Sequence, residues 1–239
     1  MMIKQTVVLL WLVVPIAAGA AHAQDGEAPQ DKPLAARYET VGVDRAGRVT
    51  QKSDWYLVRT ASRIETAAEG RAEIWERSER GDVSMRRVLR DDQFILEYHP
   101  GDLRAMSIEP QWRALGTVVD PHELPKLTRA GSKKALGRTA QVYRSRAGRD
   151  RVEVWWIQDV SLPALVKRSG ELGTYTMKLV DVRESAPSDW PLASHWRTEE
   201  FRVVDAADLG DLEHDPVVKR IMRADAARQV RFAPAHAHD

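Results

Sequence analysis

The segment Gly137–Val182 decides the fold and reads GRTAQVYRSRAGRDRVEVWWIQDVSLPALVKRSGELGTYTMKLVDV. β-Branched and aromatic residues dominate Val152–Ile157, as they do in half-buried strands. The short, Gly-containing segment Arg146–Asp150 is typical of a hairpin loop. The segment therefore predicts a meander with strands at Arg138–Arg146, Arg151–Gln158 and a run that continues, after a Pro-containing turn, through Ala164–Arg168 into Thr174–Val182.

Further strand-like runs precede and follow this meander. In Val49–Thr60, for example, Trp55 and Leu57 fall on the same face of the expected strand. Turns with Gly, Asp or Pro separate the runs at intervals of roughly 8–12 residues, which is typical of an antiparallel, all-β sheet. The other strands are expected at Tyr38–Val43, Val49–Thr60, Arg63–Ala67, Ala72–Arg77, Val83–Leu89, Gln93–Tyr98, Leu103–Met106 and Glu200–Val204.

One segment before the meander, Ile108–Arg129, breaks the strand pattern. Its apolar residues, among them Trp112 and Val119, recur at roughly helical spacing. Pro121 and Pro125 prevent a long helix. The segment predicts one or two short helices that cap one end of the sheet or lie in its concavity. Apolar periodicity normally means packing, so a helix that fills the core is favoured over a lipid site.

A loop and a helix are expected after the meander. The Ser- and Pro-containing segment Glu184–Thr198 predicts a loop, which could fold over the sheet. Asp215 as the N-cap and Pro216 at the first helical position mark the start of a helix that runs to about Arg228.

The first residues have the pattern of a secretory signal peptide. Lys4 precedes the apolar stretch Val7–Ala21, and Ala21–Ala23 is a small-x-small cleavage site. An uncleaved membrane anchor is the alternative, but the stretch is shorter than the roughly 20 residues that span a bilayer. The expected organisation is a signal peptide at 1–23, a flexible leader at 24–36, a single β domain with a C-terminal helix at 37–228, and a flexible tail at 229–239. A periplasmic location follows.

Charge and cysteine content exclude several classes of protein. The chain has 36 Lys and Arg against 35 Asp and Glu, so its formal charge without Lys4 is zero. A nucleic-acid-binding protein usually shows a clustered basic excess, and we expect no nucleic-acid partner. Because there is no cysteine, a disulfide framework, a thiol nucleophile and a cysteine metal site are excluded.

The polar residues form no recognisable catalytic constellation. No P-loop, dinucleotide fingerprint or nucleophile elbow is present, so we expect neither an enzyme nor a cofactor. His99, His122 and His195 are expected in structural or solvent-facing positions. The tail His236–Asp239 could chelate a metal, although a loose tail gives it little support, and no metal site is assigned. The acidic segment Asp205–Asp215 lacks the spacing of a calcium loop and predicts turns and a helix cap.

Tryptophan is unusually frequent, with eight Trp against three Phe. Trp155 and Trp156 are adjacent on one expected strand and must point to opposite faces of the sheet. Both faces therefore contact something apolar. One contact is the core, and the other is the protein's own cover or, as the less favoured alternative, a bound apolar ligand.

The meander resembles the periplasmic lipoprotein-carrier superfamily of LolA- and LolB-like proteins, and the lipid-binding domain of the sigma-factor regulator RseB. The resemblance covers Gly137–Arg168 and rests on a Gly-Arg turn, a strand with Val142–Arg144, a hairpin, the strand with Val152–Trp156, a polar turn, and the Leu-Pro start of Leu162–Val166. Two features differ from the family: no amphipathic helix is evident in Gln24–Arg37, and Asp205–Asp239 extends beyond the pattern.

The resemblance implies a mainly β fold with minor α structure: a curved antiparallel sheet, or incomplete half β-barrel, covered by short helices and enclosing an apolar cavity for acyl chains. No ligand residue of the family maps onto this chain. The expected ligand-binding residues are therefore aromatic positions near the proposed concavity: Trp55, Trp75, Trp112, Trp155, Trp156 and Tyr175.

Three functional hypotheses remain open from the sequence. The leading one is an exported periplasmic binding or carrier protein for lipid, lipoprotein acyl chains or another apolar ligand. The second is a protein-interaction module, a sensor or assembly factor, that docks a periplasmic protein partner through its sheet and C-terminal helix. The third, an exported metal-dependent hydrolase, would need ligands that converge from the histidines.

Overall fold

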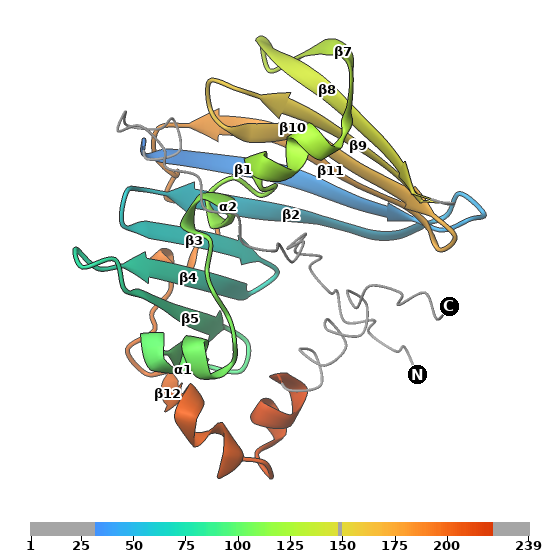
Figure 1. The fold of residues 1–239 in the computed structure, drawn as a ribbon. Helices are drawn as coiled ribbons and strands as arrows, with labels where there is room; N and C mark the ends of the chain where they lie inside the picture. The colour runs from blue at the N-terminus through green and yellow to red at the C-terminus, as the bar shows by residue number, and fades with distance from the viewer. Residues whose placement is uncertain (1–31, 148–149, 222–239) are drawn as a thin grey trace, which may run out of the picture.

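One curved sheet forms most of the protein (Figure 1). The computed structural model describes residues 32–147 and 150–221, so the expected signal peptide, most of the leader and the tail lie outside the described residues. The strands of the described part are β1 (Leu34–Val43), β2 (Val49–Arg59), β3 (Arg63–Ala68), β4 (Arg71–Arg77), β5 (Val83–Leu89), β6 (Phe94–Tyr98), β7 (Thr128–Ala135), β8 (Arg138–Ala147), β9 (Asp150–Ile157), β10 (Leu162–Gly170), β11 (Gly173–Arg183) and β12 (Arg202–Asp205).

The strand order is β12-β6-β5-β4-β3-β2-β1-β11-β10-β9-β8-β7. Strands β12 and β7 lie at opposite edges, so the 12-stranded sheet of the described residues is not closed into a barrel. All neighbours are antiparallel except β12, which pairs parallel to β6 with Arg202 opposite Phe94. The prediction of a mainly β, incompletely closed sheet is confirmed, with β12 as a parallel exception that the sequence pattern did not indicate.

The central meander contains one more strand than the sequence predicted. The run from Ala164–Arg168 into Thr174–Val182 is not continuous, because β10 and β11 form a hairpin in which Gly170 is opposite Gly173. Gly173 has a φ of +124°, and a Cβ atom there would lie 2.1 Å from the carbonyl oxygen of Val43. Only glycine fits both the backbone and the space.

The prediction of a strand at Leu103–Met106 is wrong, because this segment forms the end of the helix α1 (Pro100–Ala105) and its C-cap residue Met106. Pro100 follows the N-cap residue His99, and the Asp102 carboxylate accepts a hydrogen bond from the His99 backbone N–H at 2.7 Å. These are helix-start signals, and they outweigh the apolar alternation over so short a run.

Strand β7 was not predicted: its first two residues fall in the expected helical segment Ile108–Arg129, and no element was expected between Arg129 and the meander. Every residue of β7 except Ala135 is exposed, so there is no alternation of buried and exposed positions to detect. Its pairing with β8 is interrupted between Arg129 and Ser132, where Gly131 adopts a φ of +95°. Lys133, Lys134 and this irregularity are typical of a protected sheet edge.

Short helices cover one face of the sheet, as predicted. They are α1, α2 (Trp112–Leu115) and the 3₁₀ helix η2 (Pro121–Lys126). We call the face that packs against these helices the inner face, and the opposite one the outer face. Leu103 and Leu124 from the helices join Tyr38, Trp55 and Trp156 from the sheet in the main core.

The C-terminal helix begins where the sequence predicted. The Asp215 carboxylate accepts hydrogen bonds from the backbone N–H groups of Val217 at 2.8 Å and Val218 at 3.2 Å, and the helix is described over residues 216–221. Val218 and Ile221 are buried in the main core. This part of the helix therefore completes the fold and does not present its apolar face to a partner.

A second, smaller core lies on the outer face of β2–β6. The segment 184–201, which includes the 3₁₀ helix η3 (Ala193–His195), crosses this face as a strap. Trp190 of the strap packs on Tyr56 with 5.1 Å between ring centroids. The buried Glu65 carboxylate accepts hydrogen bonds from Arg63 at 3.0 Å and from the Ser194 backbone at 3.3 Å. The expectation that this loop could fold over the sheet is confirmed.

Arg59, at the end of β2, connects distant segments from within the core. Its side chain is 1% exposed and donates hydrogen bonds of 2.6 Å to the carbonyl oxygens of Gly116, after α2, and Val160, in the β9–β10 turn. The bond to Gly116 is buried and the bond to Val160 is partly buried, and buried backbone carbonyls need such a donor. Arg59 thus fixes the helix segment and the meander against β2.

Candidate functional site

The inner face is apolar along most of its length, and one end of it is covered less completely than the other. Around β2–β6 it lies beneath the short helices. In Figure 1 the long strands β1 and β11 continue well to the right of α1 and α2. This second part, formed by the ends of β1, β8, β9, β10 and β11 that lie near Gly42 and Tyr175, is here called the open end.

At the open end one row of side chains crosses the sheet. Val152, Arg168 and Tyr175 are register partners on β9, β10 and β11, and Tyr175 lies opposite Gly42 of β1. Tyr143 of β8 belongs to the next row, opposite Val154. These side chains are half-buried, and the apolar ones adjoin the main core. Together they form an apolar floor without complete cover from the described residues.

The titratable side chains of this row are partly shielded from water. Burial raises the pKa of Tyr175 to about 12, although a hydrogen bond with Thr40 opposes the shift. Arg168 donates a hydrogen bond of 3.1 Å to the Asp150 carboxylate, and both side chains are about two-fifths exposed. The row therefore offers apolar contact along its length and one cation that solvent can reach.

The six aromatic residues predicted as ligand contacts do not gather at one place. Trp55, Trp75 and Trp156 are buried within the protein's own core, at 3%, 7% and 2% exposure. Trp55 makes an edge-on contact with Tyr38, with ring centroids 5.4 Å apart. Their packing in the described chain leaves them no exposed surface to offer a ligand.

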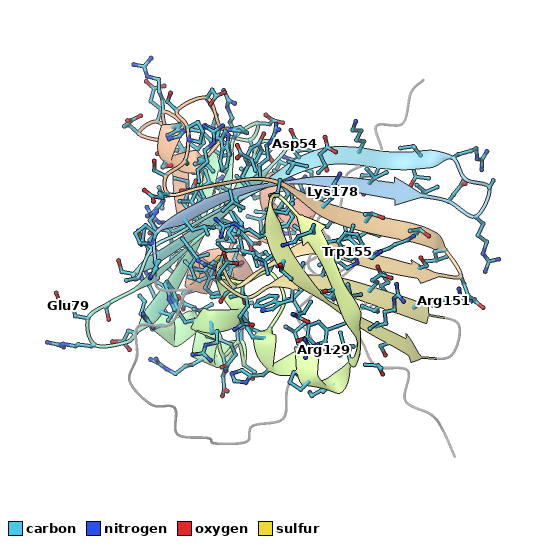
Figure 2. The ribbon with its side chains drawn as sticks, turned by 90° about the horizontal axis from the view of Figure 1, so that it is seen from above. Asp54, Glu79, Arg129, Arg151, Trp155 and Lys178 are labelled. Carbon is cyan, nitrogen blue, oxygen red and sulfur yellow. The ribbon has the colours of Figure 1, made fainter. Side chains whose placement is uncertain are left out.

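The other three candidates are half-buried. Trp112 lies in α2, beneath the guanidinium of Arg77 at 4.8 Å from the ring centroid. Tyr175 lies at the open end of the inner face. Trp155 points to the outer face, as the alternation of the strand requires, and Figure 2 labels it on that half of the sheet. Of the six, only Tyr175 belongs to the open end.

Sequence reasoning missed Tyr143 and Val152 at the open end. Both lie within the segment that carries the family resemblance, and both are inner-face positions of their strands. The period-2 pattern could have placed Val152 on the same face as Trp156, whereas Tyr143 is placed on that face by its pairing with Val154 on the neighbouring strand. It could not show that they stay half-buried, since this depends on contacts between distant segments.

The histidines have structural surroundings. His99 caps α1, and its Nε2 lies 3.2 Å from an oxygen of Asp205. His195 interacts through Nδ1 with the carbonyl oxygen of Trp190 at 2.9 Å. His122 is exposed on η2. The tail His236–Asp239 lies outside the described residues.

The acidic segment has the role that the sequence predicted. Asp205 caps the 3₁₀ helix η4 (Ala206–Gly210) by accepting a hydrogen bond from the Ala207 backbone, and Asp215 caps the following helix. Within residues 32–147 and 150–221, no three His, Asp or Glu side chains are grouped so that they could hold a metal ion. No helix in those ranges has the length and apolar character needed to cross a membrane.

Comparison with known proteins gives structural similarities only. No protein-family model matches the sequence, and no curated protein does. The fold is similar to part of PNGF-II, with a TM-score of 0.42 and 12% identity over 77% of this chain and 34% of that chain. A chain of the Pseudomonas aeruginosa MucA/MucB complex is similar with a TM-score of 0.39 and 16% identity, over 74% of this chain and 60% of that chain.

A LolA superfamily protein from Nitrosomonas europaea is also similar, with a TM-score of 0.29 and 7% identity over 66% of this chain and 88% of that chain. At these identities the similarities concern the fold alone.

Proposed function

We propose that the chain is an exported, periplasmic binding protein that carries an apolar ligand, such as a lipid or a lipoprotein acyl chain, against the open end of its inner face. One observation carries the proposal: the apolar inner face is longer than its cover. Tyr143, Val152 and Tyr175 remain half-buried where the rest of that face is closed by helices. No chemical step is assigned.

Simple energetics support an acyl chain as the occupant. Each CH₂ group that leaves water gains about 0.8 kcal/mol, so a chain that lies along several strands gains enough to bind. Tyr175 lies opposite Gly42 in the register, so its ring is the apolar side chain that this pair contributes to the floor. Arg168 lies in the same row and is partly exposed, so it can meet an anionic group at the end of the chain.

Two measurements test the proposal. Native mass spectrometry of gently extracted protein is expected to show a co-purified acyl species. Fatty acid is expected to change the fluorescence of the wild-type protein on binding. Tyr175→Ala should raise its Kd by about tenfold or more, because a large apolar contact is lost.

Val203→Ala is the matched control, since Val203 is 54% exposed on the edge strand β12, far from the open end in the strand order. Its Kd should equal that of the wild type. Absence of both a co-purified acyl species and a fatty-acid response would refute the proposal. Co-purification of a stoichiometric protein instead of a lipid would favour the protein-interaction alternative.

A further inference from the structure

A polar groove lies along β8, β9 and β10. Most of its charged lining residues belong to the outer face, and Val152 of the open end borders it as well. Its volume is about 660 Å³, within the range of about 300–1,000 Å³ that is usual for small-molecule sites. Four of the lining side chains are cations and one is an acid. The lining residues are Lys126, Thr128, Arg144, Ser145, Arg151, Val152, Glu153, Lys167 and Ser169.

The strand register explains why these charges meet. Arg144, Glu153 and Lys167 are partners on β8, β9 and β10, so they lie side by side on the outer face. Arg151 and Ser169 are partners two residues further along the same face. Figure 2 looks onto this half of the sheet and labels Arg151 and Trp155.

Glu153 forms the fixed centre of the groove. Its carboxylate accepts hydrogen bonds from Arg144 Nε at 2.8 Å and from Trp155 Nε1 at 2.5 Å. Partial burial alone would raise the pKa of Glu153, but these two hydrogen bonds, with the charges of Arg144 and Lys167, hold it below its ordinary value. Glu153 therefore stays ionised near neutral pH and orients Arg144 and Trp155.

The remaining cations differ in how far they are neutralised. Lys126 forms an ion pair of 2.6 Å with Glu123. Arg151 and Lys167 are exposed and make no hydrogen bond or ion pair within the described residues. The groove thus has a surplus of positive charge on the side of Arg151, Lys167 and the Ser169 hydroxyl.

We propose that this groove binds a phosphate group. Two guanidinium groups, two ammonium groups and several hydroxyls line the groove beside one lining carboxylate, that of Glu153, so hydrogen-bond donors outnumber carboxylate acceptors even though Lys126 is paired with Glu123. A phosphate offers several strong acceptor oxygens and more negative charge than one carboxylate, which matches this set. The site does not depend on the apolar ligand proposed for the inner face.

The phosphate can belong to a soluble molecule or to an anionic lipid headgroup, and the experiment separates these sources. Binding of inorganic phosphate to the mature, full-length protein is measured by calorimetry at low salt. Flotation is measured with phosphatidylcholine vesicles that contain or lack phosphatidylglycerol. A phosphate response without vesicle binding indicates a soluble source. Vesicle binding that needs phosphatidylglycerol indicates the headgroup.

The test variant is the double substitution Arg151→Gln/Lys167→Gln. Removing each cation removes a charge-assisted hydrogen bond to the phosphate, so the Kd of the double variant should rise by about tenfold or more. The matched control is Lys52→Gln/Lys178→Gln, which removes the same charge from exposed residues of the outer face that do not line the groove. Its affinity should change by less than about threefold, through weakened long-range attraction only.

Glu153→Gln tests whether removing a negative charge from the groove strengthens the binding of an anion. Glutamine keeps an acceptor for Trp155 and removes the negative charge, so binding of the anion should become tighter. The proposal is overturned if the wild type binds neither inorganic phosphate nor phosphatidylglycerol vesicles. It is also overturned if the control pair weakens binding as much as the groove pair, since attraction would then be general.

Discussion

The two halves of the sheet differ in how many of their faces are covered. In β2–β6 the inner face lies under the helices and the outer face under the strap 184–201, so neighbouring residues such as Ile74 and Trp75 are both buried. In the meander, Trp156 is 2% exposed on the inner face, whereas Trp155 on the outer face remains half-buried. The half with exposed surfaces carries both proposed binding sites.

The largest expected effect comes from comparing two tryptophans on the outer face, Trp190 of the strap and Trp155 of β9. Trp190 is 7% exposed in the second core, so Trp190→Ala should lower the free energy of unfolding by about 3–5 kcal/mol. Trp155→Ala, in the uncovered half, should lower it by roughly 1 kcal/mol. Urea denaturation followed by circular dichroism measures both.

Equal losses for these two variants would contradict the division into a covered and an uncovered half. A loss at Trp155 that matched Trp190 would mean that the outer face of the meander is structurally as important as the strapped face.

The next effect tests how the two halves are joined. Arg59→Met keeps the length of the side chain but leaves the carbonyl oxygens of Gly116 and Val160 without their donor. We expect a loss of about 3 kcal/mol, because buried acceptors are left unsatisfied. Arg45→Met is the control, since that side chain is 68% exposed. A loss at Arg59 no greater than at Arg45 would show that this connection is not needed.

The smallest effect is an alkaline one at the open end. The pKa of folded Tyr175 is about 12, above the ordinary value of about 10. Its raised pKa favours the protonated, folded form; this contribution is complete below about pH 10 and is lost as pH rises towards 12. Tyr175→Phe has no such proton to lose, so its stability should fall less than that of the wild type between about pH 9 and 11.

Urea midpoints measured across this pH range give the comparison. Identical slopes for the wild type and Tyr175→Phe would mean that the phenol is already solvated at the open end. Burial also raises the pKa values of Tyr38 and Tyr56. Both residues are present in the wild type and in Tyr175→Phe, so their contributions to the pH dependence of stability cancel when the two proteins are compared.

Local patterns predicted the elements whose own residues carry the signal. The alternation in Val49–Thr60 located β2, and the Asp215-Pro216 pair located the start of the last helix. Strand β7 carried no such signal, because its residues are exposed on both faces. The excess of tryptophan could not separate core positions such as Trp156 from half-buried ones such as Trp155.

The amino-acid sequence alone determined the strand-rich character, the turns and the helix caps, because these depend on the periodicity and backbone preferences of adjacent residues. Tertiary structure decided that β12 pairs parallel to β6, that the strap covers one half of the outer face, and that Tyr143, Val152 and Tyr175 stay half-buried. These features come from contacts between residues far apart in the chain. Periodicity within a segment does not record which distant segment will cover it.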